Sequence, residues 1–259
     1  MVHVSVIGCG HMGGAFIEGL ARSGEHRIVA CDVDEAALEA VAEYATTTTT
    51  ELADVAAADV VVLAVKPDLV RGIVDELELT AEHTLVSIAA GVPTTVLEDR
   101  TPATVVRVMP NLAAASGNMA AAVTGSEIPS EVETLLEDVG IAVELDEGEM
   151  DLATAINGSG PAFVFYLIKA MRDAGVERGM DEADAELLAA QTFKGAAEIV
   201  LQSDEDLESL IDAVCSPQGT TIEGMAVLRD SDVEPTVAEA VVAAEERSTE
   251  LAMDANDAE

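Results

Sequence analysis

A glycine-rich loop near the start of this chain constrains its fold more than any other feature. Residues 2–7 form a β-branched run typical of a buried parallel strand, and a helical pattern follows residue 13. Between them, residues 8–13 match the pattern G-x-G-x-x-G. In that pattern Gly8 makes a tight turn, Gly10 lets the backbone approach a pyrophosphate, and Gly13 lets the helix pack closely on the strand. The loop therefore predicts a dinucleotide-binding unit with its helix N-terminus facing the phosphates.

The end of the second predicted strand carries information about the cofactor. Residues 27–31 form this strand, and Asp32 follows it, 24 residues after Gly8. A carboxylate at this place accepts hydrogen bonds from a free ribose 2′-hydroxyl and repels a 2′-phosphate. Because no arginine occurs within residues 31–38, Asp32 favours NADH over NADPH. Asp34 is a candidate N-cap for the next helix.

Strands and helices alternate through the first half of the chain. Further buried strands are predicted at residues 59–67, 84–93 and 103–111. The alternation predicts the α/β class, with an N-terminal Rossmann doubly wound parallel sheet and right-handed crossovers. Because ligands lie beyond the carboxyl ends of such strands, Lys66-Pro67 and residues 109–111 are expected to border a nicotinamide.

From Asp151 onward the pattern is helical. Helices are predicted at residues 163–174, 184–202, 207–214, 221–228 and 235–253. The change predicts two domains, a dinucleotide-binding domain at residues 1–148 and an all-α C-terminal domain at residues 149–259. The alanine-rich faces of the helices permit close packing against a second subunit or within the domain's own core, and the sequence leaves both open.

Two irregular segments interrupt the helical half. In the first, residues 157–163, Pro161 stands in the first turn of a helix, where proline is tolerated. The second is the Ser-Pro-Gln-Gly-Thr-Thr run at residues 216–221. Thr220 and Glu223 have the spacing of a capping box, so Thr220 is expected to cap the following helix. Thr95 and Glu98 show the same spacing earlier in the chain.

If Thr220 caps that helix, Thr221 stands at the first helical position with a free hydroxyl. The backbone N–H groups of Gly219, Thr220 and Thr221 would then suit a small carboxylate. On local grounds, a turn that merely joins two helices explains the same residues equally well.

Charge excludes several classes of partner. The chain has 50 acidic residues against 12 basic ones, a formal net charge of −38, which disfavours nucleic acid and anionic membranes. The acids are spread over helix faces, as in acid-rich proteins of salt-loving microbes, where molar salt screens charge. Three distant cysteines fit no metal spacing and predict a reducing, cytoplasmic compartment without a metal cofactor. Neither a secretory signal nor a membrane-spanning run is recognised.

Together these motifs resemble one enzyme family. The segments VIGCGHMGGA, AVKP, RVMPN, NGSGPAF, QTFKGAA and SPQGTT occur in the order and at the spacing of pyrroline-5-carboxylate reductases, over essentially the whole chain. The resemblance implies NAD(P)H-dependent hydride transfer to the C=N bond of (S)-1-pyrroline-5-carboxylate, giving L-proline in the last step of proline biosynthesis. It also implies a homodimer formed through the helical domain, which in this family often assembles into rings of dimers.

The resemblance also assigns roles to residues. Thr221 would be the catalytic residue, with its hydroxyl on the ring nitrogen. The substrate-binding residues would be Asn157, Gly158, Ser159, Gly219, Thr220 and Thr221. The cofactor-binding residues would be Gly8, Gly10, His11, Met12, Gly13, Asp32, Ala64, Val65, Lys66, Pro67 and Asn111.

The chain departs from the family pattern at several of these places. Gln218 replaces a glycine able to take positive φ, and Asn157 replaces a serine at the start of the Gly-Ser-Gly segment. Many family members carry an asparagine that contacts the adenosine end of the cofactor, and this chain has Glu51 near that position. The Glu51 carboxylate again favours NADH. Two rival functions stay open: a β-hydroxyacid dehydrogenase-like enzyme with Lys169 as acid or base, and a non-catalytic NAD(P)-binding regulator.

Overall fold

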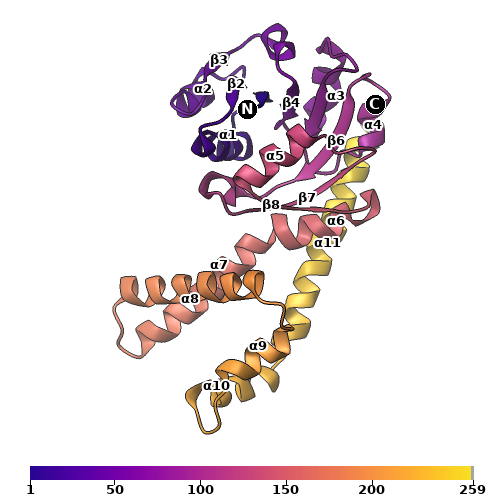
Figure 1. Ribbon diagram of the computed structural model, residues 1–259. Helices are drawn as coiled ribbons and strands as arrows, with labels where there is room; N and C mark the ends of the chain where they lie inside the picture. Colours follow the sequence, from indigo (N-terminus) through magenta and orange to yellow (C-terminus); the bar gives the residue numbers. More distant parts are fainter. Residues whose placement is uncertain (258–259) are drawn as a thin grey trace. The chain divides into compact units, whose positions relative to one another are not determined.

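The computed structural model describes the backbone of residues 1–257 and the side chains of residues 1–252 (Figure 1). The chain forms two compact units. Unit 1 comprises residues 1–159 together with the chain from Val242 onward, and unit 2 comprises residues 160–241. This division falls at Ser159, later in the chain than the predicted change at residue 148. The domain limits of 1–148 and 149–259 stay a prediction.

Unit 1 contains a sheet of eight strands within the described residues. The strands are β1 His3–Ile7, β2 Arg27–Cys31, β3 Thr47–Thr49, β4 Val60–Leu63, β5 Thr84–Ser87, β6 Thr104–Met109, β7 Met119–Gly125 and β8 Gly140–Glu144. They lie in the order β3-β2-β1-β4-β5-β6-β7-β8. All neighbours pair in parallel except β6 and β7, which are antiparallel. The predicted parallel sheet is confirmed. Strands β3, β7 and β8 are not among the predicted strands, and they extend the sheet at its two edges.

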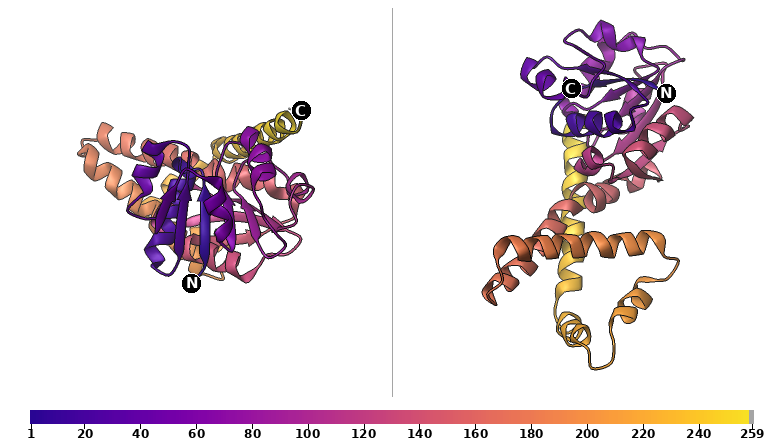
Figure 2. Two further views of the ribbon diagram at one scale, coloured as in Figure 1. Left: turned by 90° about the horizontal axis from the view of Figure 1, so that it is seen from above. Right: turned by 60° about the vertical axis from the view of Figure 1, so that its left-hand side comes forward.

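Helices cover both faces of this sheet (Figure 1 and Figure 2). They are α1 His11–Ser23, α2 Glu35–Val41, α3 Pro67–Glu76, α4 Thr94–Glu98, α5 Ser130–Val139 and α6 Met150–Ala153. Phe16 of α1 and Leu135 of α5 pack on one face together with Val4 and Val6 of β1. On the other face, α3 and α4 pack in a second core cluster. This two-sided burial explains why the central strands read as continuous apolar runs.

The start of α4 differs from its prediction. Pro93 is the N-cap, and no side chain of the described residues caps this helix. The Thr94 hydroxyl instead donates a hydrogen bond to Glu147 at 3.0 Å. The predicted capping box of Thr95 and Glu98 is therefore wrong, because the N-cap is Pro93, two residues before Thr95.

Unit 2 is helical, as predicted. Its helices are α7 Gly160–Glu177, α8 Glu182–Gln202, α9 Leu207–Val214, α10 Thr220–Arg229 and the first part of α11 Val233–Asp257. Helices α7 and α8 lie side by side (Figure 2). A Cβ on Gly175 of α7 would lie 3.2 Å from Ala185 Cβ of α8. Among the described residues of α7, α9 and α10 none is buried, and α8 buries only two alanines. A single chain thus leaves most apolar side chains of unit 2 exposed.

Candidate functional site

The glycine loop joins β1 to α1, and two of its glycines are required by packing. Gly8 has φ +95°, and a Cβ there would lie 2.5 Å from the Ala64 carbonyl oxygen. A Cβ on Gly13 would lie 1.9 Å from the Gly8 oxygen. By contrast, a Cβ on Gly10 would have no heavy atom of the described residues within 4 Å. The packing roles predicted for Gly8 and Gly13 are confirmed, and Gly10 faces space that a ligand can occupy.

Asp32 is held against this loop at the end of β2. Its Oδ2 accepts a hydrogen bond from the Cys9 N–H at 2.6 Å, and its Oδ1 accepts one from the Asp34 N–H at 2.9 Å. Asp34 caps α2 by accepting from the Ala36 N–H at 2.9 Å, which confirms it as an N-cap. The two aspartates therefore have separate tasks, and the Asp32 carboxylate lies beside the glycine loop.

The thiols beside Asp32 are kept neutral. Burial raises the pKa of the Cys9 thiol to about 12, and the negative charge of Asp32 and the nearby Cys31 contribute smaller increases. Burial and Asp32 likewise raise the pKa of Cys31 to about 11. A neutral Cys9 adds no negative charge to a loop suited to phosphate groups.

The AVKP segment adjoins the glycine loop. The Ala64 N–H donates to the Ile7 oxygen at 2.8 Å, and Val65 lies beside Gly8. Lys66 is the N-cap of α3, and Pro67 is its first residue. The candidate residues at the ends of β1, β2 and β4 therefore meet at one edge of the sheet, as the parallel topology predicts. His11 begins α1 at this edge, and Met12 packs on the core.

A second cluster joins the end of β6 to the segment after α6. There, α6 continues into a π-helical turn, Thr154–Gly158. The Asn157 Nδ2 donates to the Met109 oxygen at 2.6 Å and to the Ala120 oxygen at 2.8 Å. The Asn111 Nδ2 in turn donates a hydrogen bond to the backbone carbonyl oxygen of Asn157 at 3.1 Å. The structure thus brings together two residues that the sequence assigned separately, Asn111 to the cofactor and Asn157 to the substrate.

The turn before α10 differs from its prediction. The Gly219 N–H donates to the Ser216 oxygen at 2.9 Å, and Gln218 has φ +63°. With Pro217 at the second position, this is the pattern of a type II turn. Gly219 is the N-cap of α10, and within the described part of the chain no side chain caps the helix. The prediction that Thr220 caps the helix is wrong, because the turn places the N-cap one residue earlier.

Because Gly219 is the N-cap, the backbone groups available at the turn differ from those predicted. The Gly219 N–H is used within the turn. Thr220 and Thr221 begin the helix, so their N–H groups have no partner within it. The turn belongs to unit 2, whereas the glycine-loop edge and the Asn111–Asn157 cluster belong to unit 1. The substrate-binding roles that the family resemblance implies for Gly219, Thr220 and Thr221 stay predictions.

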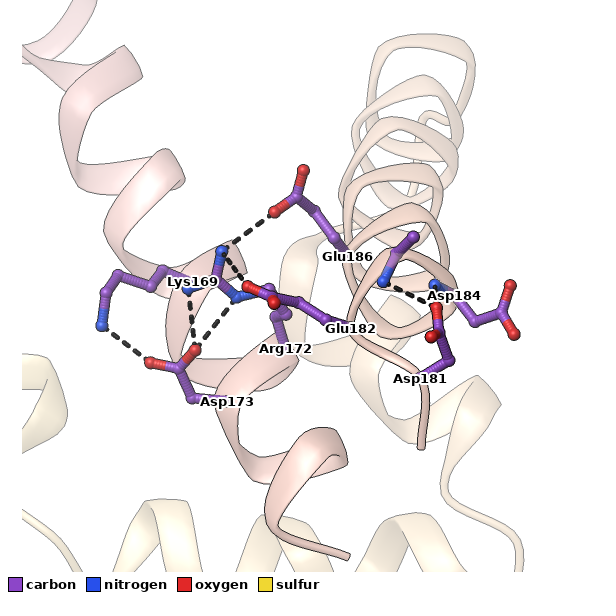
Figure 3. Close-up of polar contacts among 8 residues, drawn as sticks. Lys169, Arg172, Asp173, Asp181, Glu182, Asp184 and Glu186 are labelled. Atoms are coloured by element: carbon purple, nitrogen blue, oxygen red, sulfur yellow. Dashed lines mark hydrogen bonds and ion pairs between the residues drawn. The ribbon is translucent and has the colours of Figure 1, made fainter. Parts of the chain in front are cut away.

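Lys169 lies in an ion-pair network on α7 and α8, which Figure 3 shows. Its Nζ contacts Asp173 Oδ2 at 2.7 Å, and its side chain is 60% exposed. Arg172 also binds Asp173 and reaches Glu186 at 3.0 Å. Hydrogen bonds from Lys169 and Arg172 lower the pKa of Asp173. These contacts favour a surface role for Lys169 over the acid–base role of the rival dehydrogenase interpretation.

Among the residues that the structure describes, no group of three or more His, Cys, Asp or Glu side chains is placed to hold a metal ion. None of the described helices combines the length and the apolar character needed to cross a lipid bilayer.

Comparisons with known proteins match both parts of the chain. Residues 147–251 match the pyrroline-5-carboxylate reductase dimerisation family, and residues 3–91 match the family described as NADP oxidoreductase, coenzyme F420-dependent. A pyrroline-5-carboxylate reductase of Methanosarcina acetivorans is 38% identical, over 96% of this chain and 97% of the relative. One of Pseudomonas aeruginosa is 39% identical, over 96% of each.

Solved structures resemble the whole chain. A pyrroline-5-carboxylate reductase from Coxiella burnetii aligns with a TM-score of 0.87 at 29% identity, over 96% of this chain and 98% of that one. The Plasmodium falciparum pyrroline carboxylate reductase, with NADP bound, aligns with a TM-score of 0.82 at 28% identity, over 97% and 98%. A reductive aminase from Aspergillus terreus shares only the fold, at 16% identity and a TM-score of 0.59.

Proposed function

The chain belongs to the pyrroline-5-carboxylate reductase family, and we propose that its glycine-loop edge binds the dinucleotide while the turn before α10 binds the substrate. The activity is that of an NAD(P)H-dependent oxidoreductase acting on a CH–NH group, which reduces 1-pyrroline-5-carboxylate to L-proline. The proposed cofactor residues are Gly8, Gly10, His11, Met12, Gly13, Asp32, Ala64, Val65, Lys66, Pro67 and Asn111. The proposed substrate residues are Asn157, Gly158, Ser159, Gly219, Thr220 and Thr221.

The residue inventory fits this chemistry. The nicotinamide supplies the hydride when it is bound. An iminium carbon is already electrophilic, so the protein mainly has to hold donor and acceptor carbons about 3–3.5 Å apart. The exposed Thr221 hydroxyl would orient the ring nitrogen by a hydrogen bond and assist its proton handling. No strong acid or base is required for this step.

The substrate carboxylate would bind at the start of α10. The N–H groups of Thr220 and Thr221 begin this ten-residue helix, where the positive end of the helix dipole attracts an anion. Gly219 would contribute close backbone approach, since its own N–H is used in the turn. The observation that carries this assignment is the type II turn, which leads directly into two adjacent threonines.

Replacement of Thr221 tests the assignment. In Thr221→Ala we expect kcat with pyrroline-5-carboxylate to fall about tenfold to a hundredfold, because the ring nitrogen loses its hydrogen-bond partner. The Kd for NADH, measured by fluorescence without substrate, should stay unchanged. Wild-type kcat in the variant would contradict the role of Thr221.

We further propose that NADH is preferred over NADPH. The Asp32 carboxylate is anchored by two backbone N–H groups beside the glycine loop. The Asp32 N–H bonds to the Thr49 oxygen at 3.2 Å, which brings the end of β3 close, and Glu51 follows two residues later. Two carboxylates at this edge would repel a 2′-phosphate. A kcat/KM that is higher with NADPH than with NADH would refute the preference.

The helical part supports a homo-oligomer. Residues 147–251 match a dimerisation family, and helices α7 and α8 expose large apolar side chains such as Phe165, Tyr166 and Leu187. Covering such side chains favours association with a second copy. We propose a homodimer through unit 2, which can assemble further into a ring of dimers. Sedimentation velocity would distinguish the two sizes.

The charge supports a cytoplasmic protein adapted to high salt. On α7 and α8, Arg172 is shared among Asp173, Glu182 and Glu186, so acids outnumber bases locally as well as overall. The three cysteines are free, which suits a reducing compartment. Raising KCl from about 0.1 M to about 1 M, where the Debye length falls from roughly 10 Å to 3 Å, should raise the melting temperature. A lower melting temperature at high salt would contradict the adaptation.

A further inference from the structure

We propose that Asn157 is a positioning residue, whose carboxamide fixes the π-helical turn Thr154–Gly158 to the ends of β6 and β7. Its Nδ2 donates to Met109 of β6 at 2.6 Å and to Ala120 of β7 at 2.8 Å. We call this arrangement, together with the bond from Asn111, the asparagine lock. What the locked segments bind rests on the proposed function, whereas the lock itself is a feature of unit 1.

The orientation of the Asn157 amide follows from its partners. An amide nitrogen carries two hydrogens, and here both meet carbonyl oxygens. The opposite orientation would place Oδ1 against those two acceptors. Oδ1 is buried and has no hydrogen-bond partner among the described residues. The value of this side chain therefore lies in its two donors, which a serine, with one shorter donor, cannot supply together.

Asn111 holds the backbone of the same π-helical turn from the other side. Asn111 is buried, and its Nδ2 donates to the backbone carbonyl oxygen of Asn157 at 3.1 Å. Its Oδ1 accepts from the Ala113 N–H at 3.1 Å. Asn111 thereby fixes the start of the 3₁₀ helix Leu112–Ser116 as well as the π-helical turn. The Asn111 side chain thus joins a proposed cofactor residue to the segment that carries Asn157, Gly158 and Ser159.

The lock extends to the neighbouring residues. The Ser159 N–H donates to the Thr154 oxygen at 3.0 Å, the i−5 bond of a π-helix. A Cβ on Gly158 would lie 3.1 Å from Met109 Cε, so this glycine packs tightly on the strand that Asn157 binds. Displacing Asn157 would therefore move Gly158, Ser159 and Asn111 together.

Variants of Asn157 in the full-length enzyme test this. Asn157→Asp keeps the shape but loses both donors, and we expect kcat to fall about a hundredfold, as for a misplaced site. Asn157→Ser keeps one donor and should lose about tenfold, equivalent to one hydrogen bond. Both variants should also weaken NADH binding measured without substrate. Asn118→Ser is the matched control, because exposed Asn118 donates to Ser116 outside the lock, and it should behave as wild type.

Asn157 also stands among the proposed substrate residues, so the alternative is that it acts only by direct contact with the substrate and does not position the neighbouring segments. In that case only the KM for pyrroline-5-carboxylate would rise, with NADH affinity unchanged, and the proposal would be overturned. Effects of Asn111→Ala and Asn157→Ser that simply add would also overturn it, since residues in one hydrogen-bond network are non-additive. If Asn157→Asp fails to fold by circular dichroism, Asn157→Ser carries the test. If the wild type binds NADH but does not reduce the substrate, the proposed function fails while the NADH readout still tests the lock.

Discussion

The glycine loop at residues 8–13 and the turn at residues 216–219 both lead into a helix, but their backbones are held in different ways. In the loop, a glycine takes the positive φ, and Asp32 binds the backbone from a neighbouring strand. In the turn, the exposed Gln218 takes the positive φ, and the closing bond is local.

The two segments obtain their shapes from different contacts. The loop is fixed by a buried sheet and tolerates no Cβ at Gly8 or Gly13. The turn is fixed mainly by Pro217, whose ring presets its own φ. It also contains Gln218, a non-glycine residue for which a positive φ costs about 1–2 kcal/mol. Replacing a packed glycine of the loop should therefore lower the free energy of unfolding, whereas introducing a glycine at Gln218 of the turn should raise it.

The largest effect is expected at Gly13. Gly13→Ala would place a Cβ 1.9 Å from the Gly8 oxygen, a backbone atom that cannot move without displacing β1. We expect the free energy of unfolding to fall by about 3 kcal/mol or more. Urea denaturation of the purified enzyme measures this. A variant with wild-type stability would show that the loop is not held by packing.

Gly10→Ala is the matched control. Its Cβ would meet no heavy atom within 4 Å, so stability should change by less than about 1 kcal/mol. Because Gly10 faces the space proposed for the pyrophosphate, its NADH affinity should nevertheless fall. Loss of stability without loss of affinity would reverse the roles of the two glycines.

The reactivity of the thiols should also differ between the buried glycine-loop region, with Cys9 and Cys31, and the more exposed turn region, with Cys215. At pH 8, about a quarter of an ordinary thiol of pKa about 8.5 is ionised, and only the thiolate reacts. The pKa of Cys9, raised to about 12, leaves about one part in ten thousand as thiolate. Alkylation of Cys9 and Cys31, followed by mass spectrometry, should be at least about a hundredfold slower in the native enzyme than in urea. Half-exposed Cys215 should be less protected, and rapid native labelling of Cys9 would contradict its burial.

The sequence predicted the parts that depend on local patterns. The roles of Gly8 and Gly13 follow from a strand, a tight turn and a helix within twelve residues, and the helices of unit 2 follow from periodicity. β7 was missed because its Met-Ala-Ala-Ala run has weak strand propensity. The caps expected at Thr95 and Thr220 failed for one reason: Pro93 and Gly219 already occupy the N-cap.

The asparagine lock could not be predicted in the same way. Asn111 and Asn157 are 46 residues apart, and each stands in a motif with its own expected ligand. The one signal was the departure of Asn157 from the serine of the family, which showed that the position was unusual without showing its partners. Hydrogen bonds between distant segments depend on strand register, which the sequence leaves open where β7 is unpredicted.

The smallest effect is expected at Gln218. Gln218→Gly removes the strain of positive φ but adds about 0.5–1 kcal/mol of backbone entropy to the unfolded chain, so a net stabilisation of about 0.5 kcal/mol is expected. Gln218→Val should destabilise, because a β-branched residue disfavours this conformation most strongly. Thermal melts of the two variants, with kcat measured in parallel, separate strain from function. If Gln218→Gly is less stable than wild type, the glutamine side chain must make contacts that outweigh its strained backbone. The turn would then resemble the glycine loop in being held from outside.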